Sequence, residues 1–78
     1  MQKYKLVEGD DENRVSIVDM EFTTSFAALS AIKALSGFYD RGGCAAVVSE
    51  KDAPAVFHLR VYDKKLKQID YYLIKQPA

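Results

Sequence analysis

Residues 39–48, "YDRGGCAAVV", combine the residue types in this chain that are best suited to chemistry. The stretch holds an arginine, two adjacent glycines and the only cysteine. Such a set suits either a glycine loop that binds phosphate or a cysteine that acts as a nucleophile. Which of these chemistries is available depends on the elements before and after the stretch.

The glycine pair lies on the wrong side of a helix for phosphate binding. A glycine loop binds phosphate where it precedes a helix, because the unpaired amides and the positive end of the helix dipole then point at the anion. Gly42 and Gly43 instead follow a segment with helical spacing, so they meet its carbonyl end. The pattern G-x-x-x-x-G-K-[ST] is also missing. We therefore interpret the two glycines as a helix stop.

The cysteine lacks the surroundings of a catalytic thiol. A reactive thiolate is stabilised by a helix amino terminus, a cation or a histidine. Cys44 follows a helix carboxyl end and enters the apolar run "AAVV", and only Arg41 nearby favours activation. His58, the single histidine, lies on a different predicted strand. We expect Cys44 to be a buried structural residue.

Metal binding and acid–base catalysis find little support in the sequence. One histidine and one cysteine cannot complete a zinc site within one chain. The acidic residues at 8–12 lack the spacing of a calcium loop and are typical of a solvated turn. The carboxylates in the predicted strands form no pair that the sequence can define. We therefore predict a protein that is not an enzyme and that has no metal site and no cofactor.

Composition indicates a small globular protein. Its 78 residues make one domain, 1–78, with 49% hydrophobic residues and a net charge of zero. Zero net charge disfavours duplex nucleic acid and membrane surfaces as partners. The lone cysteine, the short apolar segments and the polar amino terminus predict a cytoplasmic protein without a membrane span. A domain this small without a disulfide or metal needs very good packing or an oligomer.

The periodicity of apolar residues predicts one helix and five strands. The helix runs from Ser25 to about Asp40, and the hydroxyl residues 23–25 at its start suit an N-cap; Gly37 offers an earlier end that we consider less favourable. The strands are expected at 3–8, 14–22, 44–50, 56–63 and 67–75. The fold is therefore α+β with the order β-β-α-β-β-β: a largely antiparallel sheet of four to five strands with the helix packed on one face.

The last two strands each have one apolar face, which we assign to the helix side: Phe57, Leu59 and Val61 on one strand, and Ile69, Tyr71 and Leu73 on the other. Their opposite face mixes aromatic, aliphatic and charged residues. Strand 14–22 is apolar on both sides, which is typical of a strand buried on both faces. Because one helix covers one side only, we expect a homodimer mate or a partner protein to cover the other.

The helix carries few charges, since Lys33 is the only charged residue between Phe22 and Phe38. An exposed helix face usually carries more. Either small residues let the helix lie close to the sheet, or the helix has a contact surface of its own. A dimer interface or second contact face would then include Val18, Met20, Ala27 and Ala34.

These features favour a non-enzymatic protein-interaction domain that occupies a surface of a larger partner. By analogy with other small neutral proteins, we expect a regulator or inhibitor, of the kind that phages encode. The predicted partner-binding residues are His58, Arg60, Tyr62, Tyr72 and Ile74, since tyrosine and arginine are enriched where binding energy concentrates. The alternative is single-stranded nucleic-acid binding, with stacking on Tyr62 and Tyr72 and phosphate contacts from Arg60, Lys3, Lys5 and Lys75.

Overall fold

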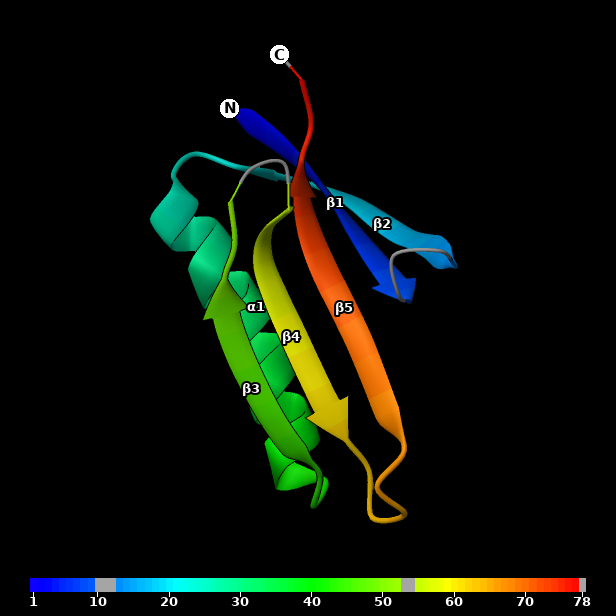
Figure 1. Cartoon of the computed structure of the whole chain (residues 1–78). Helices are drawn as coiled ribbons and strands as arrows, with labels where there is room; N and C mark the ends of the chain where they lie inside the picture. Colours follow the sequence, from blue (N-terminus) through cyan, green and yellow to red (C-terminus); the bar gives the residue numbers. More distant parts are fainter. Residues whose placement is uncertain (10–12, 53–54, 78) are drawn as a thin grey trace.

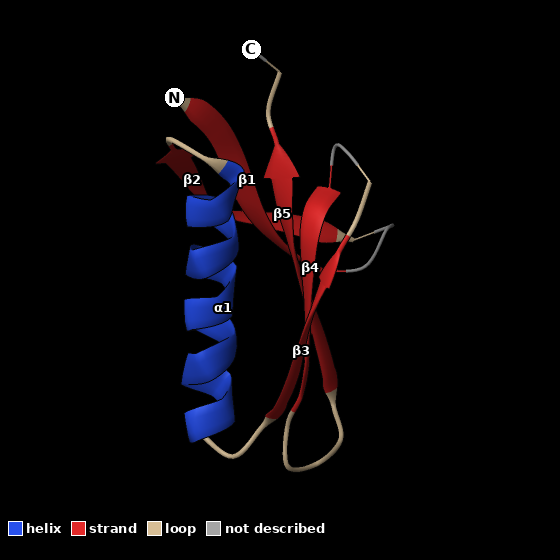
Figure 2. Ribbon diagram, turned by 90° about the vertical axis from the view of Figure 1, so that its left-hand side faces the viewer, coloured by secondary structure: helices blue, strands red, loops and turns tan. Residues whose placement is uncertain are grey.

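The protein forms one open antiparallel sheet with a single helix on one face (Figures 1 and 2). The computed structural model describes residues 1–9, 13–52 and 55–77. The elements are β1 (Gln2–Gly9), β2 (Arg14–Phe22), α1 (Ser25–Arg41), β3 (Ala45–Glu50), β4 (Ala55–Tyr62) and β5 (Gln68–Lys75). The predicted α+β class and the order β-β-α-β-β-β are confirmed, and the sheet has five strands.

The strand order is β2-β1-β5-β4-β3, so α1 connects the two edge strands. The first and last strands pair at the centre of the sheet, which brings both chain ends to the same end of the molecule (Figure 1). The backbone amide of Gln76 donates to the carbonyl of Lys3 at 2.9 Å. The carboxy-terminal strand is therefore needed to join the β1–β2 hairpin to the rest of the sheet.

Local signals set both ends of α1. The hydroxyl of Thr24 accepts a hydrogen bond from the backbone amide of Ala27 at 3.1 Å, which satisfies one amide of the first turn. At the other end the amide of Gly42 donates to the last turn of the helix, and Gly43 has a φ of +87°. A positive φ favours glycine, so the chain reverses here into β3. The later of the two predicted helix ends is confirmed.

The core lies between α1 and the sheet. Ala28 and Ile32 of the helix pack against the buried side chains of the central strands, which are Tyr4, Phe57, Leu59, Val61 and Leu73. The helix-side faces predicted for the last two strands are confirmed. At the rim, the hydroxyls of Tyr39 and Tyr71 form a 2.5 Å hydrogen bond that ties the helix to β5. Burial, followed by the contact with Tyr39, raises the pKa of Tyr71 above its usual range.

The second strand differs from the prediction of burial on both faces. β2 is an edge strand that pairs only with β1, and Val15 is 63% exposed. The reason lies in the position of α1, which packs mainly against β3 and β4 at the other side of the sheet. Only the end of β2, with Met20 and Phe22, packs against the core. Within one chain, the apolar residues of β2 therefore remain largely open to solvent.

Within the residues that the structure describes, no helix is long and apolar enough to cross a membrane.

Candidate interaction surface

The five residues predicted to bind a partner lie on the sheet face opposite α1, which we call the open face. His58 lies opposite Tyr72 in the β4–β5 pair, and Arg60 lies opposite Asp70. Tyr62 and Ile74 continue the same face, because they alternate with residues of the core. Antiparallel pairing therefore gathers the five predicted residues on two adjacent strands.

Asp70 is the centre of the polar contacts on the open face. Its Oδ1 accepts from His58 Nε2 at 2.7 Å and from Arg60 Nε at 2.9 Å. Its Oδ2 accepts from the side-chain amide of Gln68 at 2.7 Å. Three side chains from two strands are therefore held by one carboxylate, which fixes their positions on the surface.

The contacts of Asp70 keep this carboxylate ionised. Burial raises its pKa, but the hydrogen bonds from Gln68, Arg60 and His58 outweigh burial and lower the pKa to about 2. The same contact raises the pKa of the Arg60 guanidinium, mainly through the hydrogen bond to Asp70. The cluster thus carries a fixed ion pair at neutral pH.

An aromatic stack lies beside this cluster. The rings of His58 and Tyr72 are parallel within 6°, with centroids 4.4 Å apart. The guanidinium carbon of Arg14 lies 4.5 Å from the centroid of the Tyr72 ring. Because β2 and β4 lie on opposite sides of β5, Arg14 and His58 cover opposite faces of that ring. Tyr72 therefore presents its edge to solvent, while its ring faces are occupied.

His58 is the most buried of the five predicted residues of the open face. The residue is only 6% exposed, and its ring is covered by Tyr72 and bonded to Asp70. A general base must come within hydrogen-bond reach of its substrate. The imidazole is covered by the Tyr72 ring and offers a substrate little access, whereas the Asp70 carboxylate lines a hollow in the surface. His58 positions the contact residues and is too buried to be one of the larger contacts.

Other residues of the open face are more accessible to solvent than His58. The Arg60 side chain is 42% exposed, and Tyr62 and Ile74 are half-buried. The exposed Val47 of β3 lies opposite Arg60 in the β3–β4 pair. Arg14 and Val47 were missed in the sequence because their places beside these residues depend on strand order and register. Alternation alone puts Gln68 and Asp70 on the face of Tyr72 and Ile74, but it does not put Asp70 next to Arg60.

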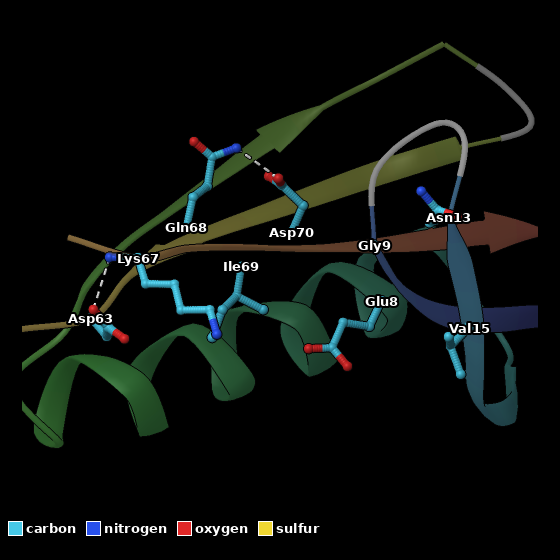
Figure 3. Close-up of a pocket in the computed structure, with 9 residues that line it drawn as sticks. All are labelled: Glu8, Gly9, Asn13, Val15, Asp63, Lys67, Gln68, Ile69 and Asp70. Atoms are coloured by element: carbon cyan, nitrogen blue, oxygen red, sulfur yellow. Dashed lines mark hydrogen bonds between the residues drawn. The ribbon is translucent and has the colours of Figure 1, made fainter. Parts of the chain in front are cut away.

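A hollow lies where the β1–β2 hairpin separates from β5, and Figure 3 shows its lining. Its volume is about 640 Å³, and it is lined by Glu8, Gly9, Asn13, Val15, Asp63, Lys67, Gln68, Ile69 and Asp70. Glu8, near the end of β1, and Lys67, just before β5, line the same hollow, so an acidic and a basic side chain lie at this end of the sheet. Residues 10–12 of the acidic turn lie outside the described residues.

The cysteine and the histidine do not come together. Cys44 is half-buried and packs against the core on the helix side, whereas His58 lies on the open face. The described part of the chain contains no group of three or more His, Cys, Asp or Glu side chains placed to hold a metal ion. The geometry of Cys44 is that of a packing residue.

The second predicted contact face, with Val18, Met20, Ala27 and Ala34, lies on the helix side of the molecule. Met20 lines an apolar hollow of about 160 Å³ together with Leu6, Ala31, Ile32, Leu35 and Leu73. Val18 and Ala34 are exposed, and Ala27 is half-buried. Of the four predicted residues, Met20 alone lines this hollow, and the helix contributes Ala31, Ile32 and Leu35 to it.

No family model, curated protein or solved structure matches this chain. The function must therefore be inferred from the geometry of its surfaces.

Proposed function

We propose that this chain is a non-enzymatic interaction domain that binds a larger protein through the open face of its sheet and acts there as a regulator or inhibitor. The observation that carries the proposal is the Asp70 cluster, which holds His58, Arg60 and Gln68 in one arrangement. A preorganised surface loses less conformational entropy on binding than a mobile one. Arg60, Tyr62 and Ile74 beside it are residue types that contribute strongly to protein interfaces or fill their apolar centres.

A protein partner fits this surface better than a single-stranded nucleic acid. Base stacking needs an open aromatic face, but Arg14 and His58 cover the two faces of Tyr72. The Nε of Arg60 is engaged by Asp70, which neutralises much of its charge toward a phosphate. The mixture of Tyr62, Ile74 and Val47 around Arg60 instead suits a partner with an apolar patch and a carboxylate that reaches the remaining guanidinium donors.

The proposal is tested with two matched variants. In Arg60→Ala/Tyr62→Ala the accessible side chains of the open face are truncated, and in Leu66→Ala an exposed residue of the β4–β5 turn is truncated as a control. Protein captured by the immobilised wild type is identified, and its affinity for all three proteins is measured by calorimetry. We expect binding by the wild type and the control and a loss of at least about 30-fold for the double variant, the size expected at an interface hot spot.

Equal affinity for all three proteins would show that the open face is not the binding surface. A fluorescence anisotropy titration with single-stranded DNA and RNA gives the second test. Tight binding that weakens steeply with salt would replace the protein partner with a nucleic acid.

A further inference from the structure

The helix side of the sheet has room for a second helix. Five strands spaced about 4.8 Å apart span about 19 Å, whereas a helix with its side chains is about 10 Å across. The single helix packs mainly against β3 and β4, on the other side of the sheet from β1 and β2 (Figure 1). Helix-side residues of β1 and β2 are therefore partly open, and Val18 is 46% exposed. The apolar hollow beside Met20 and Leu35 lies at the border between the covered and the open parts.

The flank of α1 next to this hollow is apolar. Ala31 and Leu35 line the hollow, and Ala27, Ala34 and Phe38 extend the same flank at helical spacing. Phe38 is 64% exposed although it is a large apolar residue. Two of the charged residues of the helix, Lys33 and Asp40, project on the far side of the helix. Arg41 follows Phe38 by three residues and continues this flank at the carboxyl end of the helix, where its guanidinium lies near Gly37.

The residues of this flank are spaced so that two copies of the helix can pack against each other in antiparallel orientation. Ala27, Ala31, Ala34 and Phe38 follow in steps of four, three and four residues, the pattern of a helix–helix seam. The steps are the same in both directions along the helix. In an antiparallel pair of identical helices, Ala27 therefore lies opposite Phe38 of the second copy, and Ala31 lies opposite Ala34 of the second copy. Each large side chain thus meets a small one, which allows close packing.

From these relationships we infer that a second copy of this chain covers the hollow, through an antiparallel α1–α1 contact along Ala27, Ala31, Ala34 and Phe38. The arrangement is two-fold symmetric, with both chains using the same surface. Met20 of β2 lines the hollow beside this contact. The interface lies on the opposite side of the sheet from the open face, so this inference does not depend on the proposed function.

The solvent-accessible area of the chain is larger than that of a typical monomer of its mass, which supports a second copy as the occupant. The chain exposes 5290 Å², whereas a typical monomer of this mass exposes about 4,800 Å². The excess of about 500 Å² is more than half of the roughly 800 Å² that each partner covers in a standard interface. A domain of this size without a disulfide is also one that gains from an oligomer.

Pairing through the β2 edge is a poorer route to a dimer. The register of β1 and β2 shifts between Leu6 and Val7, so Ile17 is an extra residue in β2. Such a bulge interrupts the regular hydrogen-bonding edge that a second strand needs. The helix flank carries no such interruption.

The solution mass tests the inference. Light scattering coupled to size-exclusion chromatography, from low micromolar to submillimolar protein, should give twice 8.8 kDa at the higher concentrations. Phe38→Asp places a charge in the seam and should weaken the dimer at least about 30-fold. Leu66→Asp is the matched control, because Leu66 is exposed in a turn with a φ of +62° that aspartate tolerates. A monomer at every concentration, or a dimer that survives Phe38→Asp, would overturn the inference.

Disulfide trapping tests the direction of the helices. In a Cys44→Ala background, a mixture of Ala31→Cys and Ala34→Cys chains should form a crosslinked dimer under mild oxidation. Ala27→Cys alone should not, because the two copies of residue 27 lie about 16 Å apart along antiparallel axes, beyond the reach of a disulfide. Crosslinking of Ala27→Cys to itself would mean a parallel pair and would reject the proposed seam.

Discussion

His58 and Tyr72 lie opposite each other in β4 and β5, and their rings stack at 4.4 Å. The stack joins the aromatic side chains of the open face to the Asp70 cluster, since His58 also bonds to Asp70. A contact between two rings on adjacent strands stabilises a fold by more than the burial of its apolar area alone.

This stack should be detectable as an energetic coupling. Tyr72→Leu removes one ring, and His58→Gln removes the other while keeping a side-chain donor for Asp70. In a double-mutant cycle followed by urea unfolding, we expect a coupling free energy of about 0.5–1.5 kcal/mol. Effects that add to within about 0.3 kcal/mol would mean that the two rings do not stabilise each other.

Replacing Asp70 by asparagine should destabilise the fold. The amide group cannot accept hydrogen bonds at both positions, so at least one of the donors loses its acceptor: Gln68 in one amide orientation, or His58 and Arg60 in the other. We expect the free energy of unfolding to fall by about 1–3 kcal/mol. Asp19→Asn on the exposed part of β2 is the control, with a change within about 0.5 kcal/mol. Equal losses in the free energy of unfolding for the two variants would show that the contacts of Asp70 add no more stability than an exposed carboxylate.

Acid should weaken the wild type through the same carboxylate. The pKa of Asp70 is lowered from 3.8 to about 2 in the folded state, so its ionised form stabilises the fold above pH 3.8. This stabilisation is lost as the pH falls from 3.8 toward 2, and with screening by solvent we expect a loss of about 1 kcal/mol. Urea unfolding at several pH values should show this component in the wild type and not in Asp70→Asn. Parallel pH curves for the two proteins would contradict the assignment.

Two glycines should respond to alanine in opposite ways. Gly9 has a φ of +128°, and a Cβ there would meet the backbone carbonyl of Asn13, so Gly9→Ala should cost more than about 1 kcal/mol. Gly37 lies within α1, where a Cβ would meet only the end of the Arg41 side chain. Gly37→Ala should therefore stabilise the fold by about 0.5–1 kcal/mol. Thermal unfolding of both variants checks the pair, and stabilisation by Gly9→Ala would show that the hairpin tolerates a side chain.

The helix cap offers a further local test. Thr24→Ala removes the acceptor for the Ala27 amide and should lower the free energy of unfolding by about 1 kcal/mol. Thr24→Ser keeps a hydroxyl at the same place, and its free energy of unfolding should differ from that of the wild type by only a few tenths of a kcal/mol. If serine were as harmful as alanine, the loss would come from the methyl group and not from the cap.

The sequence by itself determined the elements and the buried faces of β4 and β5. The alternation of Phe57, Leu59 and Val61 identified the helix side of β4, and the glycine pair after Asp40 identified the end of α1. These features depend on neighbours within a few residues, because the period of a strand or helix and the φ of a glycine are local properties. The element order and the fold class followed from them.

Only the tertiary structure decided which residues meet. Strand order made β2 an edge strand, although its composition is typical of a buried one, and it brought Arg14 across the sheet to Tyr72. Register made Asp70 the partner of Arg60, and the path of α1 brought Ala31 to the hollow beside Met20. Such contacts depend on how residues far apart in the chain pack together, and no local pattern records that choice.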